Sequence, residues 1–214
     1  MAEPASTGTT RRTEVHAEGT WFGTMQRSFE EVPIDAENGI STVEFLEAAQ
    51  ALTTMFDALQ SVAFKFVKDD LINNITKIQK RYDAAPAESQ TLQALVSNEL
   101  KTGKHTASEG LLWLVRGLEF TVKALRLTLD KPSVEISKTF SEAYAETLQK
   151  VHNWIAGKGI AQAIKSGAPY REVFYGKLGG DPDAINAAMR KEVVALEKVV
   201  EILQTFQADK KNQW

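Results

Sequence analysis

Three polar residues stand at helical spacing in a stretch that is otherwise rich in aliphatic side chains. Asp70, Asn74 and Lys77 occupy positions i, i+4 and i+7, which places them in one row on a helix. Together they supply an acceptor, a mixed donor and acceptor, and a point-charge donor. Such a set suits an uncharged ligand rich in hydroxyls and amides. On spacing alone, a solvated helix face with an Asp–Lys pair explains the row more simply, so other regions must decide.

Two further regions carry side chains suited to binding. Trp113 lies in a segment so apolar that core packing is the default interpretation, and stacking of a sugar ring or another planar group on the indole is the functional alternative. Neighbouring Arg116 should need a carboxylate or carbonyl partner. His152 is at the edge of an apolar stripe, where a satisfied interior histidine is the simpler interpretation. Trp154 lies about 200° around the same predicted helix, so it points outward if His152 points inward; interface contact and partial burial both fit.

The composition excludes several classes of function. The 214 residues include 25 basic and 28 acidic side chains, giving a net charge of −3, which argues against nucleic-acid binding and a strong polybasic membrane anchor. There is no cysteine, and the three histidines, His16, His105 and His152, are widely separated. We therefore expect no disulfide, no metal site and no cofactor.

Catalysis and membrane insertion are also not expected. The sequence contains no GxSxG, P-loop, GxGxxG or HExxH motif. Asp70 and His152 can form an acid–base pair, but no serine or metal cluster accompanies them. The N-terminus lacks the apolar core of a signal peptide, and no run of 18 apolar residues is present. We expect a non-enzymatic cytoplasmic protein.

The periodicity of apolar residues predicts an all-α protein of about eight helices. Residues 1–18 resemble a mobile tail and 19–214 a single domain. A short helix is expected near 20–29, and longer ones over about 41–59, 62–83, 108–129, 133–156 and 182–206. Another is capped by Ser89 or Thr91 and extends to about 100, and a further short helix ends at Ala168-Pro169-Tyr170. Ser41 and Glu44 form a predicted capping box, and Asp181-Pro182 a helix start. Gly157 and Gly159 should break or kink the helix that begins at Ser133.

Several short motifs occur in a characteristic order. They are Phe-Leu-Glu-Ala (45–48), Asp-x-x-x-Asn-Ile-x-Lys (70–77), Leu-Leu-Trp-Leu-x-Arg-Gly-Leu (111–118), His-x-Trp (152–154) and Ala-Pro-Tyr (168–170). With these motifs the sequence resembles the glycolipid transfer protein family, most closely its fungal heterokaryon-incompatibility branch. The resemblance extends from about Phe45 to Trp214.

The resemblance implies a two-layer sandwich of α-helices that carries one sphingolipid. Asp70, Asn74 and Lys77 would then hydrogen-bond the headgroup sugar and the ceramide amide. Trp113 would stack under the sugar, and His152 would bond the amide carbonyl. The residues expected to dock on a membrane are Trp154 and Lys158. Side chains on apolar helix faces that are candidates for lining a ceramide tunnel are Phe56, Phe64, Val67, Phe120, Tyr144 and Leu148.

The expected ligand is a mono- or diglycosylceramide, moved between membranes by a monomer or weak dimer that contacts the bilayer transiently. Relatives that carry ceramide-1-phosphate have arginine at the position of Trp113 and one turn earlier, where this chain has Glu109, so a neutral sugar is favoured. Transfer of ceramide-1-phosphate and a lipid-sensing signalling or interaction module remain alternatives. The chain departs from the family pattern at Phe66, at Asn73 and in the stretch containing Gly157 and Gly159.

Overall fold

A computed structural model describes residues 18–59, 62–152 and 154–213, without the side chains of 58, 62, 63, 154–158, 163 and 166. In these ranges the chain is helical, and isolated bridges such as Ile34–Ile40 are its only β-pairing. The α-helices are α1 (Thr42–Thr53), α2 (Met55–Ala58), α3 (Val62–Ala84), α4 (Leu92–Lys101), α5 (Thr106–Asp130), α6 (Ile136–Glu146), α7 (Trp154–Gly167), α8 (Arg171–Lys177) and α9 (Pro182–Ala208). Short 3-10 helices are η1 (Trp21–Thr24), η2 (Phe29–Glu31), η3 (Pro86–Glu88), η4 (Leu148–Lys150) and η5 (Lys210–Asn212).

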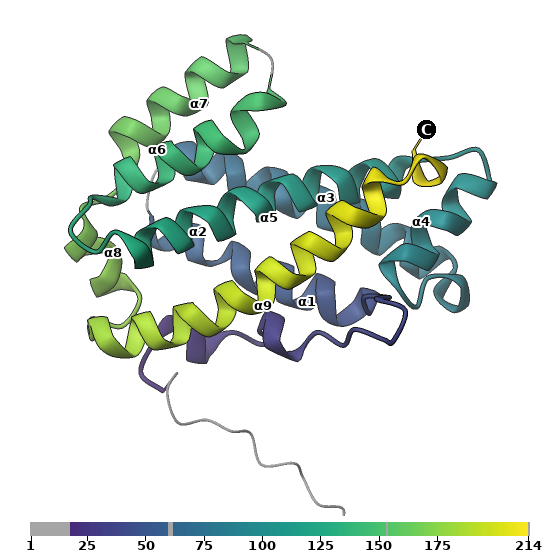
Figure 1. Cartoon of the computed structure of the whole chain (residues 1–214), viewed down its shortest axis with the longest axis horizontal. Coiled ribbons are helices and arrows are strands. Elements are labelled where there is room, and N and C mark those ends of the chain that lie inside the picture. Colours follow the sequence, from purple (N-terminus) through teal and green to yellow (C-terminus); the bar gives the residue numbers. More distant parts are fainter. Residues whose placement is uncertain (1–17, 60–61, 153, 214) are drawn as a thin grey trace, which may run out of the picture.

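Helix α5 is the centre of the fold, as its nearly uniform apolar sequence predicts. It packs against α3, α4, α6 and α9, and it buries residues on most of its circumference. Figure 1 shows α9 crossing the molecule diagonally, with its C-terminal end toward α4 and far from α7. Helix α3 lies along α5 and also contacts α1 and α7. The predicted functional residues of α3 and α5 are therefore carried by the two most closely packed helices.

Local signals predicted several helix ends correctly. The Thr91 hydroxyl accepts a hydrogen bond from the Ala94 backbone N–H at 3.1 Å and begins α4. The Asp181 carboxylate accepts one from Asp183 N–H at 3.0 Å, with Pro182 as the first residue of α9. At α1 the predicted capping box does not form, because the Ser41 hydroxyl bonds the Glu44 carboxylate rather than a backbone N–H.

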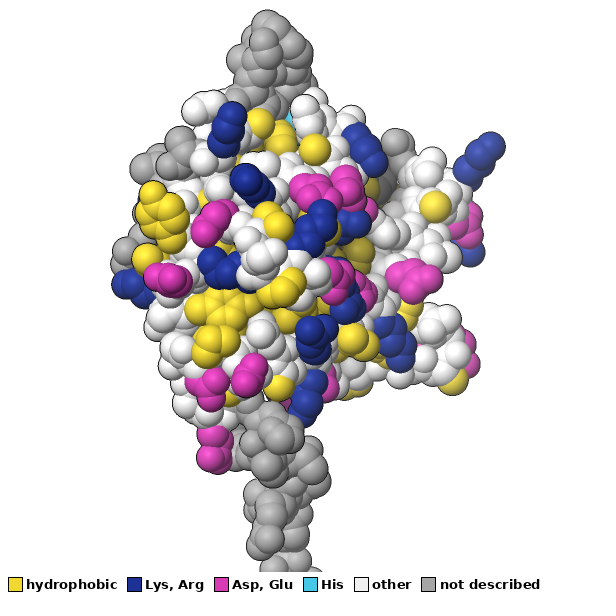
Figure 2. All heavy atoms as spheres, turned by 60° about the vertical axis from the view of Figure 1, so that its left-hand side comes forward, with side chains coloured by type: hydrophobic (Ala, Val, Ile, Leu, Met, Phe, Trp, Pro, Cys, Tyr) yellow, Lys and Arg dark blue, Asp and Glu magenta, His cyan; other side chains and the backbone are white. Residues whose placement is uncertain are grey.

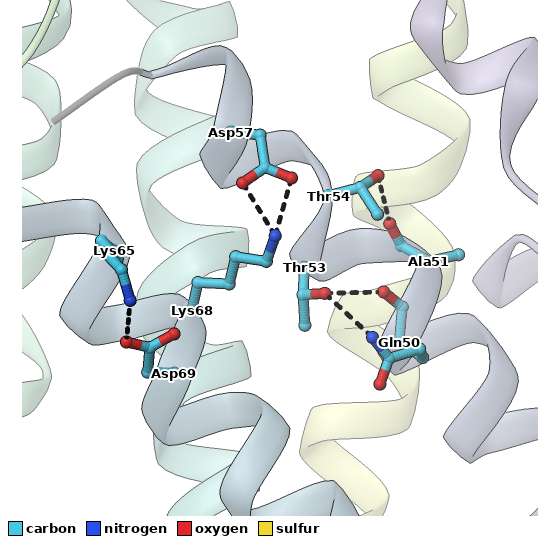
Figure 3. Close-up of polar contacts among 8 residues, drawn as sticks. All are labelled: Gln50, Ala51, Thr53, Thr54, Asp57, Lys65, Lys68 and Asp69. Carbon is cyan, nitrogen blue, oxygen red and sulfur yellow. Dashed lines mark hydrogen bonds and ion pairs between the residues drawn. The ribbon is translucent and has the colours of Figure 1, made fainter.

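The predicted helix over 41–59 is interrupted at Thr54, so that α2 is separate from α1. Figure 3 shows the Thr53 and Thr54 hydroxyls donating to the Gln50 and Ala51 carbonyls, each at 2.8 Å. Such bonds compete with the regular helix ladder. In the same view, Lys68 of α3 contacts both oxygens of Asp57 at 2.7 Å. This ion pair ties α2 to α3 after the break.

The predicted helix over 133–156 is wrong in its C-terminal part. Helix α6 ends at Glu146, and Thr147 has φ −117° and ψ −94°, outside the helical region. The chain then forms η4 and a turn at Val151 and His152 before α7. The side chain of Val151 is 39% exposed. Gly157 and Gly159 lie within α7 and do not interrupt it.

The expected short helix at 20–29 is replaced by η1 and η2. They belong to residues 18–33, here called the N-terminal strap, which packs on α9 and α1. Trp21 N–H donates to the Leu178 carbonyl at 2.8 Å. At that crossing Gly179 has φ +128°, and a Cβ there would lie 2.5 Å from the Gly19 carbonyl oxygen, so a glycine is needed. The predicted mobile tail at 1–18 lies, except for its last residue, outside the described residues.

The surface carries intermingled charges. Figure 2 shows the side that lies to the left in Figure 1, where basic and acidic side chains alternate around hydrophobic ones. This face therefore presents no large field of one sign. In the described part of the chain, no helix combines the length and apolar character needed to cross a bilayer.

Candidate functional site

The polar row predicted on α3 is present as a chain of hydrogen bonds. The Asn74 side-chain amide donates to Asp70 Oδ2 at 3.2 Å, and Lys77 Nζ donates to Asn74 Oδ1 at 3.2 Å. Asn74 is only 1% exposed, whereas Lys77 is half-buried and Asp70 keeps an exposed surface. The amide therefore anchors the row, and the outer two side chains retain further hydrogen-bonding capacity toward solvent.

The pKa of Asp70 is raised above its ordinary value, although its neighbours oppose the rise. Burial of the carboxyl raises the pKa of Asp70, while the positive charge of Lys77, the nearby His152 and the bond from Asn74 all act to lower it. The three groups that lower the pKa lie at different positions around the carboxyl. Asp70 thus combines partial desolvation with groups that favour its ionised, hydrogen-bond-accepting form.

Two glycines of α5 allow α3 to lie close to Trp113. A Cβ added to Gly110 would lie 3.1 Å from the Cβ of Lys77, and one added to Gly117 would lie 2.6 Å from Leu71 Cδ2. The glycines are seven residues apart, about two helical turns, and Trp113 lies between them. Sequence reasoning missed their role, although their spacing on one helix face was a usable signal.

Trp113 and His152 come together beside this row. Their rings are 6.3 Å apart between centroids and inclined by 22°, in a nearly parallel arrangement. Trp113 is half-buried, so it is neither a core residue nor freely exposed. Arg116 has no carboxylate or carbonyl hydrogen-bond partner among the described residues; its guanidinium carbon instead lies 4.7 Å from the centre of the Trp113 ring. The expected polar partner of Arg116 was therefore wrong.

The break after α6 is what brings His152 to this place. The Tyr144 hydroxyl lies 2.9 Å from His152 Nδ1. Burial lowers the pKa of His152, Arg116 lowers it further, and the carboxylate of Asp70 opposes both. The structure thus brings Asp70, Trp113 and His152 together from α3, α5 and the turn before α7: Asp70 and His152 interact through charge, and Trp113 and His152 through their rings.

An unbroken series of ring contacts runs from Tyr144 into the interior. Ring centroids lie 6.3 Å apart for Tyr144 and Phe120, 6.0 Å for Phe120 and Phe140, and 5.3 Å for Phe140 and Phe64. Phe64 then stacks on Phe56 at 6.2 Å. All five are buried. Four of them are predicted tunnel residues, and Phe140, expected only in the core, connects them.

The remaining predicted residues fall in different surroundings. Val67 is half-buried against the core. Leu148 is buried and lines a pocket of about 640 Å³ with Arg116 and residues from the C-terminal end of α9. The side chains of Trp154 and Lys158 lie outside the described residues, and the outward direction inferred for Trp154 relied on a continuous helix that does not form. Within the described ranges, no group of three or more acidic or histidine side chains is arranged to hold a metal ion.

Comparison with known proteins gives this group of residues a context. Residues 40–180 match the family described as Glycolipid transfer protein (GLTP). The chain belongs to the glycolipid transfer protein family. A glycolipid transfer protein of Aureobasidium melanogenum is 48% identical over 196 residues, which cover 92% of this chain and 96% of that protein. The family consists of lipid transfer proteins rather than enzymes, which confirms the prediction that this chain is not an enzyme.

Solved structures confirm the predicted all-α fold of the glycolipid transfer protein type. The crystal structure of HET-C2, a fungal glycolipid transfer protein, matches with a TM-score of 0.86 and 51% identity, covering 91% of this chain and 100% of that one. A structure described as showing how FAPP2 selects simple glycosphingolipids matches with a TM-score of 0.79 and 30% identity, covering 88% and 94%. The predicted resemblance to the fungal branch is thereby confirmed.

Proposed function

We propose that this protein binds a glycosphingolipid and transfers it between membranes, with the sugar at the Asp70–Asn74–Lys77 row and the ceramide chains among the buried rings. The observation that carries the proposal is the continuity of these two regions. A hydrogen-bonded polar row lies beside Trp113 and His152, and ring contacts lead from His152 through Tyr144 to Phe120 and beyond. An amphipathic ligand needs a polar region for its headgroup that continues directly into an apolar region for its chains.

The energetics of lipid desorption explain why a carrier is built in this way. A sphingolipid presents on the order of 30 CH₂ groups, each costing roughly 0.8 kcal/mol to expose to water. Unassisted desorption therefore faces a barrier of about 20 kcal/mol or more. A carrier that offers apolar side chains throughout transfer removes most of this cost. The ring series from Tyr144 to Phe56 offers such a surface once the rings separate to admit the chains.

The residues around Trp113 favour a neutral sugar as the headgroup. Trp113 is half-buried and offers an indole face, and Glu109, one turn earlier, is exposed. An acid at this position opposes binding of a phosphate, which is typically held by paired cations. Asp70 and Lys77 supply an acceptor and a donor to sugar hydroxyls. FAPP2, a protein of this fold that selects simple glycosphingolipids, agrees with this choice.

The apolar residues at the border of the site support contact with a bilayer. Phe66 precedes Asp70 by one helical turn and is 67% exposed, and Val151 beside His152 is 39% exposed. A lipid drawn from a membrane must reach Asp70 without crossing much water, so exposed apolar side chains at this border suit an interfacial position. Trp154 and Lys158 are proposed to extend the same contact.

A vesicle-to-vesicle transfer assay tests the proposal. Fluorescent galactosylceramide, lactosylceramide and ceramide-1-phosphate are compared at equal protein concentration. We expect the two glycosylated lipids to move and ceramide-1-phosphate to move at least tenfold more slowly. Transfer of the phosphate lipid alone would contradict the assignment of the headgroup. Absence of any transfer, together with specific retention of lipid, would instead favour a lipid-sensing module.

A further inference from the structure

The contact between Tyr144 and His152 sets the chemistry of the histidine ring. Tyr144 is in the last turn of α6 and is 1% exposed. Its hydroxyl lies 2.9 Å from His152 Nδ1. In a continuous helix these residues, eight apart, would be separated by about 12 Å along the axis. An uninterrupted helix could not make this contact, which therefore requires the break at Thr147.

This contact leaves a single ring nitrogen for the site. Because Nδ1 faces Tyr144, only Nε2 is available to a ligand. A neutral imidazole carries a proton on one nitrogen and a lone pair on the other. Burial and the positive charge of Arg116 both favour neutral His152. The negative charge of Asp70 acts on the same ring and favours a polarised N–H over a lone pair on the side that faces the site.

We propose that Tyr144 is a positioning residue, whose hydroxyl donates to His152 Nδ1 and thereby holds the ring with Nε2–H available as a donor to the ligand. This inference rests on the proposed function and deepens it. Asp70 as acceptor and His152 as donor together match the N–H and C=O of an amide. The tyrosine hydroxyl thus supports the hydrogen bond from His152 to the ligand carbonyl without touching the ligand.

Among the described residues, the groups that act on His152 come from three helices. Asp70 faces it from α3, Trp113 and Arg116 from α5, and Tyr144 from α6. The positive charge of Lys77 acts to lower the pKa of Asp70. Tyr144→Phe keeps the ring that packs on Phe120 and removes only the hydroxyl. Tyr175→Phe is the matched control, since Tyr175 is also buried and its hydroxyl donates to Asn186 Oδ1 at 2.7 Å, away from the site.

The first measurement is the tautomer of His152 from ring ¹⁵N chemical shifts, with the His152→Gln variant identifying its signals among the three histidines. In the unmodified protein we expect the proton on Nε2. In Tyr144→Phe we expect the pKa of His152 to rise, since the bond that favours the neutral ring is lost, and the Nδ1–H form to become populated. Tyr175→Phe should match the unmodified protein. A proton on Nδ1 in the unmodified protein, or unchanged signals in Tyr144→Phe, would overturn the proposal.

The second measurement is the affinity for galactosylceramide in vesicles. We expect Tyr144→Phe to lower this affinity about three- to tenfold, the range of one oriented hydrogen bond, with no change in Tyr175→Phe. An unchanged affinity in Tyr144→Phe contradicts a part for Tyr144 in ligand binding. If the unmodified protein does not bind galactosylceramide, the proposed function fails, and the tautomer measurement still decides whether Tyr144 orients His152.

Discussion

The candidate site and the N-terminal strap each place a carboxyl group against the protein interior, where burial raises the pKa of both carboxyls, but the neighbouring groups act in opposite directions. Asp70 receives a hydrogen bond from Asn74 and lies near Lys77 and His152, all of which oppose the rise in its pKa caused by burial. Glu192 of α9, 3% exposed, accepts the Phe29 backbone N–H at 3.2 Å to each oxygen. Burial, together with the negative charges of Glu30 and Glu31, raises the pKa of Glu192 to about 7 although the bond from Phe29 acts to lower it.

The difference separates the acid that we propose to bind ligand, Asp70, from Glu192, which holds the strap on α9. Around Asp70, positive and polar groups with spare hydrogen-bonding capacity favour the charged form, which can serve an incoming donor. Glu192 is among acidic neighbours under the strap, where its charged form is disfavoured. Changes at the two positions should therefore affect different properties, transfer at Asp70 and pH-dependent stability at Glu192.

The largest effect on transfer is expected from Asp70→Val. The substitution removes the acceptor for the Asn74 amide and the proposed acceptor for the ligand, at a position that keeps solvent exposure. We expect transfer of galactosylceramide to fall to background while the melting temperature stays nearly unchanged. Asp69→Val is the control, because Asp69 is exposed and pairs only with Lys65 on the surface among the described residues. Retained transfer in Asp70→Val removes Asp70 from the site.

The largest effect on stability is expected from Glu192 and pH. Its pKa is about 7 in the folded protein against an ordinary value of 4.5, so its contribution to the free energy of unfolding is fully present below pH 4.5. That contribution is lost as the pH rises through 7. At 1.36 kcal/mol per pKa unit the loss is on the order of 3 kcal/mol. Glu192→Gln should remove this pH dependence.

Urea denaturation at pH 5 and pH 8 measures this contribution. The stability of Glu192→Gln relative to the unmodified protein should increase between the two pH values. Glu201→Gln, an exposed position on the same helix, should show no such change. If the difference between Glu192→Gln and the unmodified protein were equal at both pH values, Glu192 would not be the titrating group under the strap.

An intermediate effect is expected at Trp113, which is half-buried between the polar row and His152. Trp113→Ala should weaken binding of galactosylceramide by about 1–3 kcal/mol if the indole stacks on the sugar. Trp113→Phe should retain part of that affinity, because it keeps an aromatic face. Binding is measured by titration with lipid vesicles alongside thermal melting. Loss of folding with unchanged lipid preference would show that Trp113 is a packing residue.

Local signals in the sequence were enough to locate the polar row. The apolar stripe of α3 fixes which residues face the core, and Asp70, Asn74 and Lys77 follow from helical spacing alone. The hydrogen bonds between these side chains agree with that spacing. The starts of α4 and α9 were also predictable, since Thr91 and Asp181 cap their own helices. Each of these features depends on residues within a few positions of one another.

Features that depend on distant residues could not be predicted. Nothing in the residues around Thr147 breaks a helix, and the apolar stripe continues through Leu148, so a single helix was the reasonable expectation. The break is compatible with tertiary contacts that the sequence does not display, above all Tyr144 with His152. Conversely, a glycine destabilises a helix by only about 1 kcal/mol relative to alanine, and α7 includes Gly159 without a break. Gly110 and Gly117 had a clear spacing, but only the structure identifies α3 as their partner.

The smallest effect is expected at the border of the site, where Phe66 departs from the family pattern. Its ring is 67% exposed, one turn before Asp70, whereas Val194 is 59% exposed on α9. Phe66→Ser should lower partitioning onto phosphatidylcholine vesicles about two- to fivefold, because a partly inserted ring contributes only part of its full burial energy. Val194→Ser, which also removes an exposed apolar side chain, should leave partitioning unchanged. Vesicle sedimentation measures both. Equal partitioning of the two variants would mean that the membrane meets the protein at a face other than the one bearing Asp70.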